Sequence, residues 1–427
     1  MRILYVTNYY PPHYIGGYEL HCAAAAEWLA ENGHEVRILT GNYRRENVDD
    51  ETPPEGIQVY RALQLRYWKD ITDTSYWNRE FKDVGTFRQH LAEFKPDIVV
   101  LWNMVKLASG IVMEAQRSTP ILVYHLMDEW LANFRKSNGL PQYWARPAQS
   151  AWGSALKPLF RSIYHTMLTP DLEDWHPENA VLVSHALGEL VNLAGISFRN
   201  THISYITYDS ALFEGLPART KSEDGALRFF WAGRLCAGKG LHTTLRALDM
   251  LWEMQPEGWQ VDFCGPIEEA DMENLLRPKL ENAPWKERVQ YLGSLPHRLM
   301  PAQYREHDIF LFTSEVHEGM PGTIVEAFAA GMPVIGTLTG GTKDLLIPDS
   351  NCLIYPMGDA LLLAQAMRRL LNDAELRRRI SSETILFAKG QCSPAKVFPR
   401  LLEFYERLLI KAGRMEAPKH QHPRERL

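Results

Sequence analysis

Short runs of β-branched and aromatic residues alternate along the chain with longer segments in which apolar positions recur every three or four residues. The short runs predict buried strands, and the longer segments predict amphipathic helices. In the first half the expected strands are RILYVT, EVRILT, IQVYRAL, DIVVLW, ILVYHL and AVLVS, and in the second half LRFFWAG, WQVDFCG, VQYLG, DIFLFTS and MPVIGT. Alternation of this kind predicts an α/β protein with parallel sheets and crossover helices.

The length of the chain favours two domains, because 427 residues exceed what one hydrophobic core usually serves. Charge, glycine and proline gather in DSALFEGLPARTKSEDGA, where the apolar periodicity lapses. We therefore predict an N-terminal Rossmann-like domain over 1–208 and a C-terminal one over 209–392. A helix over 393–412 is expected to return towards the N-terminal domain, and the charged residues 413–427 are expected to be disordered.

Composition excludes several classes of protein. With 46 basic and 52 acidic residues, the chain lacks the positive charge of a nucleic-acid-binding protein. Its five cysteines have neither zinc-site spacing nor the density of a disulfide scaffold, which favours a cytoplasmic location. The apolar run at the N-terminus is too short for a signal peptide, and no run reaches the length of a membrane span. Any membrane contact would be peripheral.

The segment SAWGSALKPLFRSIYHTML predicts an amphipathic helix. One face would carry Trp152, Leu156, Phe160 and Tyr164, with Lys157 and Arg161 at its edge. We favour a helix packed on the core with its cations reaching solvent. The alternative is a face that meets a membrane or a lipid-like acceptor.

The motif GRLCAGKG, residues 233–240, lies between an expected strand and an expected helix. It is close to a P-loop, but Gly240 stands where that motif needs a hydroxyl for magnesium, so an NTPase is disfavoured. We predict instead that Arg234 and Lys239 face a phosphate group, which glycine allows the backbone to approach. The alternative is a pair of ordinary surface cations.

Gly16 and Gly17 lie between the first expected strand and the first expected helix. Free amides at a helix start favour an anion. The pair lacks the G-x-G-x-x-G pattern, so a nicotinamide dehydrogenase is disfavoured.

Two carboxylates stand eight positions apart in EGMPGTIVEAFAAGMPVIGTLTGG. Thr323 and Glu326 match a capping box, and in that interpretation Glu326 only satisfies backbone amides. Glu318 follows the strand DIFLFTS, in the type of loop where open α/β sheets bind ligands.

This stretch resembles the E-x7-E motif of the retaining glycosyltransferases of family 4. Its companions are the Gly16-Gly17 pair, GHEV before the second strand, GRL followed by KG, EAFAAGMPVIGT, and GG with Asp344 three residues later. The resemblance spans nearly the whole chain. It implies the GT-B fold, in which two Rossmann-like domains with parallel sheets face a central cleft.

The resemblance also implies roles for individual residues. Arg234 and Lys239 would bind the diphosphate of a nucleotide-sugar, which Gly16 and Gly17 would approach from the other domain. Glu326 would bind the ribose, and Glu318 the hydroxyls of the transferred sugar. The backbone after Glu318 would assist, through Gly319, Met320, Pro321, Gly322 and Thr323, while Gly265 and Leu292 would line the pocket of the base.

The implied reaction moves a sugar from a nucleotide diphosphate sugar to a saccharide, a lipid-linked acceptor or a small molecule. The leaving phosphate would accept the acceptor's proton, with attack on the same face. Since two cations are available and the chain has no D-x-D triplet, we expect neither a catalytic metal nor a cofactor.

The chain departs from the family at two positions. Many relatives carry a histidine where this chain has Met127, and His125 either takes that catalytic role or is buried in the core. Asp209 replaces a glycine before the linker, which affects the hinge. Two alternatives remain: a GT-B-fold nucleotide-sugar epimerase, and a catalytically degenerate nucleotide-sugar-binding protein.

Overall fold

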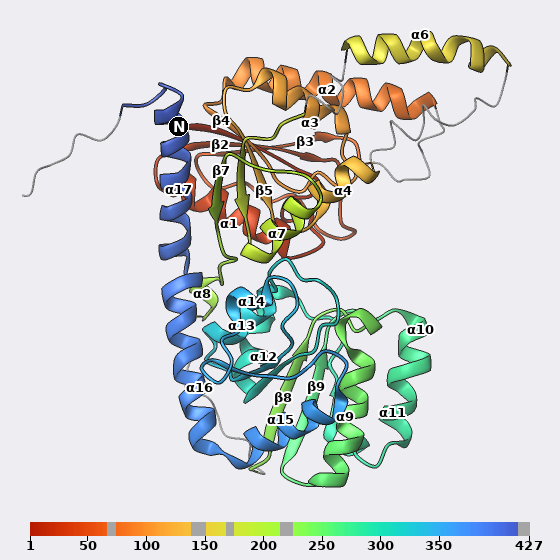
Figure 1. The fold of residues 1–427 in the computed structure, drawn as a ribbon, viewed down its shortest axis with the longest axis vertical. Helices are drawn as coiled ribbons and strands as arrows, with labels where there is room; N and C mark the ends of the chain where they lie inside the picture. Colours follow the sequence, from red (N-terminus) through yellow and green to blue (C-terminus); the bar gives the residue numbers. More distant parts are fainter. Residues whose placement is uncertain (66–73, 138–150, 168–174, 214–224, 417–427) are drawn as a thin grey trace, which may run out of the picture. The chain divides into compact units, whose positions relative to one another are not determined.

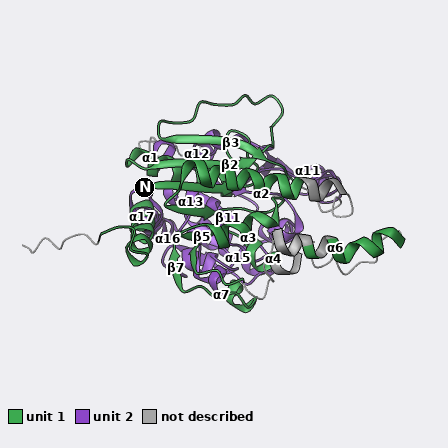
Figure 2. Cartoon of the chain, turned by 90° about the horizontal axis from the view of Figure 1, so that it is seen from above, with its two compact units in different colours: residues 1–182, 190–204, 398–427 green, residues 183–189, 205–397 purple. Residues whose placement is uncertain are grey.

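The computed structural model describes residues 1–65, 74–137, 151–167, 175–213 and 225–416. Its chain divides into two compact units, which Figure 2 colours separately. Unit 1 is made of Met1–Leu182, Leu190–Ser204 and Phe398–Leu427, and unit 2 of Val183–Glu189 and Tyr205–Val397.

The limits of the units differ from the predicted domain limits. The unit changes between Ser204 and Tyr205, a few residues before the predicted boundary, and again at Phe398, inside the predicted helix 393–412. Residues 183–189, which the prediction assigns to the N-terminal domain, group with unit 2. Residues 417–427, most of the tail predicted to be disordered, lie outside the described residues.

Unit 1 contains a seven-stranded parallel sheet in the order β3-β2-β1-β4-β5-β6-β7. Its strands are β1 (Arg2–Thr7), β2 (Glu35–Gly41), β3 (Ile57–Leu63), β4 (Ile98–Leu101), β5 (Leu122–Leu126), β6 (Asn179–Leu182) and β7 (Asn200–Ile203). The six strands expected in this half are confirmed. Strand β7 escaped prediction because its sequence, NTHI, has one strongly apolar residue.

Helices lie on both faces of this sheet (Figure 1). The helices that contain residues of unit 1 are α1 (Gly17–Glu31), α2 (Thr74–Phe94), α3 (Ser109–Ser118), α4 (Trp130–Ser137), α6 (Ala151–Met167), α7 (His185–Leu193) and α17 (Pro394–Lys411), and α7 and α17 each begin with residues counted in unit 2. Gly33, at φ 80°, ends α1: its amide binds the carbonyl of Ala30, and the next amide, of His34, binds that of Leu29. This is the Schellman arrangement, which favours glycine.

Helix α6 forms as predicted, but three of its apolar side chains do not pack on a core. Trp152, Leu156 and Leu159 are 81%, 44% and 57% exposed. Figures 1 and 2 both draw α6 outside the helices that cover the sheet of unit 1. The prediction of a core-packed face is therefore wrong for Trp152 and Leu156, whereas the side chains of Phe160 and Tyr164, which completed the predicted face, lie outside the described residues. Among the described residues, no helix is long and apolar enough to cross a membrane.

Unit 2 contains a six-stranded parallel sheet in the order β10-β9-β8-β11-β12-β13. Its strands are β8 (Leu227–Ala232), β9 (Trp259–Cys264), β10 (Val289–Tyr291), β11 (Ile309–Phe312), β12 (Val334–Gly336) and β13 (Cys352–Ile354). Its helices are α8 (Ser210–Phe213), α9 (Leu241–Met254), α10 (Glu269–Asp271), α11 (Arg277–Asn282), α12 (Met300–Glu306), α13 (Gly322–Ala329), α14 (Thr342–Leu345), α15 (Ala360–Asn372) and α16 (Ala374–Phe387). The five expected strands are confirmed, and β13 is an addition.

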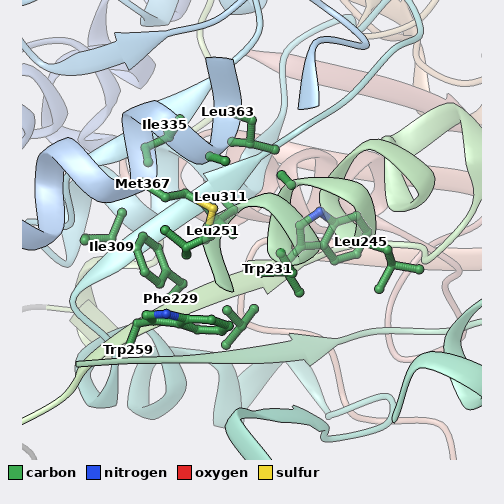
Figure 3. Packing of buried hydrophobic residues seen from close by; sticks show 14 of the residues in the cluster. Phe229, Trp231, Leu245, Leu251, Trp259, Ile309, Leu311, Ile335, Leu363 and Met367 are labelled. Atoms are coloured by element: carbon green, nitrogen blue, oxygen red, sulfur yellow. The ribbon is translucent and has the colours of Figure 1, made fainter. Parts of the chain in front are cut away.

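The core of unit 2 lies between its sheet and the apolar faces of α9 and α15. Figure 3 shows Phe229 and Trp259 from the sheet beside Leu251 of α9 and Met367 of α15. All four side chains are buried. A core of large interlocking side chains has little freedom to deform, so it gives the loops at the strand ends a rigid base.

Candidate functional site

Three loops of unit 2 begin at the carboxyl edge of its sheet. Residues 233–240 follow β8, residues 313–321 follow β11, and residues 337–341 follow β12. These three strands are neighbours in the sheet. Ligands of open α/β sheets bind outside the carboxyl ends of the strands, so this edge is the candidate site.

The structure brings Lys239 and Glu318 into direct contact. The Lys239 ammonium lies 2.5 Å from Oε1 of Glu318, and the two side chains are 32% and 12% exposed. The Ser314 hydroxyl donates a hydrogen bond to the same carboxylate oxygen. The two residues are 79 positions apart in the sequence, and the resemblance assigns one to the phosphate and the other to the sugar, but in the structure they are in contact.

Arg234 lies on the same loop as Lys239, and its side chain is exposed. None of the ion pairs found within the described part of the chain involves its guanidinium. The loop therefore offers one cation held by a carboxylate and one cation that faces solvent. A guanidinium can bind two oxygens of a phosphate at once.

Backbone contacts fix the loop that carries these cations. Gly240 has φ 75°, and a Cβ there would lie 1.9 Å from the carbonyl oxygen of Thr313. The Thr313 hydroxyl accepts a hydrogen bond from the Trp231 indole and donates one to the carbonyl of Lys239, each at 2.9 Å. Only glycine fits position 240, because the chain of one loop touches the chain of the other.

The loop after β12 fixes the backbone of the Glu318 loop in a similar way. The amide of Gly341 donates to the carbonyl of Glu318 at 2.7 Å, and a Cβ on Gly341 would lie 1.7 Å from the carbonyl oxygen of Gly319. The Ser184 hydroxyl donates to that same carbonyl at 2.7 Å. Hydrogen bonds from two segments therefore position the backbone beside the Glu318 carboxylate.

Asp344 fixes the segment that contributes Ser184. Its Oδ2 accepts hydrogen bonds from the amide of His185 at 2.9 Å and from the Nδ1 of that residue at 2.8 Å. The carboxylate is nearly buried, with 6% of the side chain exposed. Asp344, part of the motif that suggested the family, thus holds His185 and, through it, the neighbouring Ser184, which binds the Glu318 loop.

Glu326 lies on α13, but it does not cap that helix. The helix begins at Gly322 and not at Thr323, with Pro321 as the N-cap residue, so the predicted capping box is wrong. The Oε1 of Glu326 instead lies 2.7 Å from Nε2 of His297. This hydrogen bond raises the pKa of His297 against the opposing effect of burial.

Of the backbone residues that follow Glu318, Met320 is turned inward. Its side chain is 5% exposed, and its sulfur accepts a hydrogen bond from the amide of Ile206 at 3.4 Å. Gly319 and Gly322 are half-buried, as is Thr323. The prediction that this backbone assists in holding a sugar stays a prediction.

Gly265 and Leu292 follow neighbouring strands, β9 and β10. The amide of Gly265 binds the carbonyl of Gly293 at 2.9 Å, and its own carbonyl accepts the Tyr291 hydroxyl at 2.8 Å. A Cβ on Gly265, which has φ 138°, would lie 1.8 Å from the carbonyl oxygen of Gly233. Of the two residues predicted to line the base pocket, Gly265 thus lies directly against the loop that carries Arg234.

In unit 1, Gly16 and Gly17 lie at the start of α1. The amide of Gly16 donates to the Oε2 of Glu19 at 2.8 Å, so a carboxylate of the chain already binds it. Burial raises the pKa of Glu19. A Cβ on Gly17 would meet no atom within 4 Å. Contact of these glycines with a diphosphate stays a prediction.

His125 lies in the core of unit 1, which argues against the predicted catalytic role. Its side chain is 0% exposed, and its ring stacks on Trp102 with centroids 3.7 Å apart. Neither ring nitrogen has a hydrogen-bond partner among the described residues. Burial, with smaller effects of His21 and His202, lowers the pKa of His125 well below its usual value. The structure thus favours the alternative in which His125 is a core residue, packed on Trp102.

Sequence reasoning missed three residues of this site. Ser314 ends the strand run DIFLFTS and had a signal in its position, directly before the loop of Glu318. Ser184 and His297 had none, because their contacts join segments far apart in the chain. Within the described ranges, no group of three or more His, Cys, Asp or Glu side chains is arranged to hold a metal ion.

Two family models match the chain. The model of the glycosyl transferases group 1 matches residues 214–387, and that of the glycosyl transferase 4-like domain matches residues 16–169. Together they match more than half of the sequence.

Similar proteins match along most of the chain. An uncharacterized glycosyltransferase of Methanocaldococcus jannaschii is 24% identical over 89% of this chain and 91% of its own. An MMP α-(1→4)-mannosyltransferase of Mycolicibacterium hassiacum is 22% identical over 97% of this chain and 100% of its own.

Solved structures share the fold. Sucrose-phosphate synthase from Thermosynechococcus elongatus has a TM-score of 0.70 at 16% identity, over 96% of this chain and 99% of its own. Anabaena HepE in complex with UDP has a TM-score of 0.65 at 16% identity, over 95% of this chain and 100% of its own. With both halves matched by glycosyltransferase models and two parallel α/β sheets in the order described, the chain belongs to the group 1 glycosyltransferases and has their two-domain GT-B fold.

Proposed function

We propose that the protein is a retaining glycosyltransferase of family 4. It moves a sugar, a hexose, from a nucleotide diphosphate sugar to a saccharide, lipid-linked or small-molecule acceptor, without a metal ion. The observation that carries the proposal is the contact between Lys239 and Glu318, on a loop that also presents the exposed Arg234.

The proposed chemistry uses these charges directly. Cleavage of the bond between the anomeric carbon and the phosphate oxygen leaves positive character on the sugar and negative charge on the diphosphate. Arg234 and Lys239 stabilise the leaving diphosphate as its charge develops. Glu318, which already binds Lys239, accepts a hydrogen bond from a hydroxyl of the sugar. The acceptor oxygen attacks from the face of the leaving group, and its proton passes to the leaving phosphate oxygen.

The base of the donor stays open. A GDP-mannose-dependent α-mannosyltransferase of Mycolicibacterium smegmatis is 24% identical over 88% of this chain, whereas HepE was solved with UDP. The two relatives therefore point to different bases. We also propose a cytoplasmic location, and a peripheral membrane contact through the exposed apolar face of α6, with Trp152 at 81% exposure.

A thermal-shift panel tests donor binding. The wild type is measured with UDP-, GDP-, ADP- and dTDP-sugars, beside the Arg234→Ala variant. Arg246→Ala, which removes an exposed arginine of α9, is the matched control. Because a charge-assisted hydrogen bond contributes about 1.5–3 kcal/mol, Arg234→Ala should weaken binding on the order of tenfold to a hundredfold. The control should bind as the wild type does. The proposal fails if no nucleotide-sugar stabilises the wild type, or if both variants bind equally.

A transfer assay tests the reaction. The anomeric configuration of the product, read by NMR, should be that of the donor, and transfer should persist in EDTA. An inverted product or a complete loss of activity in EDTA would refute those parts. A new nucleotide-sugar formed without acceptor would identify an epimerase instead, and binding without turnover would identify a degenerate enzyme.

A further inference from the structure

His297 contributes a contact that neither the motif nor the proposed chemistry accounts for. It begins the short 3₁₀ helix His297–Leu299, and its Nε2 lies 2.7 Å from Oε1 of Glu326. The His297 side chain is 33% exposed and that of Glu326 is 15% exposed. The pair therefore lies at the border between the interior and solvent, where a ligand can reach it.

The charged groups around this pair favour a proton on the ring. Glu326 of α13 and Asp209, which directly precedes α8, both raise the pKa of His297, with the Glu326 hydrogen bond as the largest cause. Tyr304 of α12 also lies near Glu326: burial, and then the charge of Glu326 and a hydrogen bond with it, raise the pKa of the Tyr304 phenol well above its usual value. Arg298, the neighbour of His297, is exposed.

We propose that His297 is a positioning residue of the donor site, which holds Glu326 in the orientation that binds the ribose of the donor. This inference rests on the proposed function. The Nε2–H of His297 donates to Oε1 of Glu326, and this contact fixes the carboxylate, beside which the Tyr304 phenol also lies, in one orientation toward the ribose hydroxyls. Holding one oxygen removes rotational freedom that binding would otherwise have to remove.

The charge of His297 should also favour donor binding. A protonated His297 offsets the charge of Glu326, so the carboxylate repels the donor diphosphate less. When the ring loses its proton, the hydrogen bond remains in one tautomer, but the charge does not. Donor affinity should therefore fall as the pH rises through the titration of His297, which lies above the usual value near 6.5.

The competing explanation is that this contact only holds the 3₁₀ helix against α13. In that case, replacing His297 would lower stability and leave donor affinity and its pH dependence unchanged. An amide side chain separates the two explanations, because glutamine donates a hydrogen bond but does not titrate.

The test measures the Kd of UDP, GDP, ADP and dTDP by calorimetry on the full chain at about pH 6 and about pH 8.5, on either side of the histidine range. For the nucleotide that binds, the wild type should lose roughly three- to tenfold in affinity between these values. His297→Ala should bind about fivefold more weakly at the lower pH and show no such loss. His297→Gln should recover part of the affinity but not the pH dependence. His242→Ala, which changes an exposed histidine of α9, should behave as the wild type.

The outcomes separate this inference from the proposed function. If none of the four nucleotides binds the wild type, the proposed function fails and this inference fails with it. If the wild type binds but His297→Ala keeps the same Kd or the same pH dependence, only the role of His297 is overturned. If His297→Ala does not fold, His297→Gln decides, because retention of the full pH dependence in that variant would overturn the proposal.

Discussion

Replacement of Gly240 by alanine gives the sharpest test of how the cationic loop is held. Position 240 has φ 75°, and the new Cβ would lie 1.9 Å from the carbonyl oxygen of Thr313. Ordinary contacts begin at 3.4 Å, so one of the two backbone segments has to move by roughly the difference. That movement would separate Lys239 from Glu318, because Lys239 directly precedes the substituted residue.

The cost has two parts. An alanine at positive φ costs about 1–2 kcal/mol from its own backbone conformation. The overlap with Thr313 adds about 1–3 kcal/mol, the usual range for forcing extra atoms into a packed site. The first part can be measured alone with Gly258→Ala, since Gly258 has φ 83° in the same unit and its Cβ would meet only the flexible end of Gln255 at 3.9 Å.

Urea denaturation followed by tryptophan fluorescence compares the two variants, both of which alter unit 2. We expect Gly240→Ala to lower the free energy of unfolding by about 1–3 kcal/mol more than Gly258→Ala does. Donor binding should fall in the first variant and persist in the second. If the two variants agree within about 0.5 kcal/mol and bind donor equally, the argument that backbone contact fixes this loop is refuted.

Three further outcomes follow from buried or clamped polar groups. Asp262→Asn removes the buried negative charge that lies 2.8 Å from His307 and 2.7 Å from Arg228, and should lower the free energy of unfolding by about 3–5 kcal/mol in chemical denaturation. Burial lowers the pKa of His125 well below its usual value, so its contribution to stability is present above a pH of about 6.5 and is lost as the pH falls below it. The melting temperature of the wild type should therefore drop between pH 7 and pH 5, and that of His125→Phe should drop less steeply. Ser184→Ala removes the hydrogen bond to the carbonyl of Gly319 and should lower kcat about threefold to tenfold with little change in melting temperature, whereas an unchanged kcat would show that the bond does not position this loop.

The strands of both sheets could be predicted from the sequence because most are short, continuous apolar runs, as buried parallel strands usually are. Strand β7 failed that test, since NTHI carries too little apolar character and pairs through its backbone. For α6 the helix itself was predicted correctly, but the burial of its apolar face was not. Periodicity identifies an apolar face and does not show what covers it.

In the candidate site, too, local features could be predicted from the sequence and contacts between distant segments could not. The placement of Arg234, Lys239 and Glu318 in loops at the ends of strands could be predicted, because glycine spacing and the position after a strand are local properties. The contact of His297 with Glu326 could not, because it joins segments 29 residues apart whose approach depends on packing. For His125 the sequence left a catalytic role and burial in the core as alternatives, because a histidine on a buried strand has the same sequence signature whether it faces the core or the strand end.

The glycines at 240, 265 and 341 would leave less than 2 Å between an added methyl group and the chain opposite. Substitution of these three glycines, in evolution or in a mutagenesis library, therefore cannot change donor preference without displacing the backbone. Changes of donor preference have to come from side chains, such as the half-buried imidazole of His297 or the buried hydroxyl of Ser314. A library that varies those two positions and leaves the three glycines untouched would retain far more folded clones than one spread evenly over the same loops.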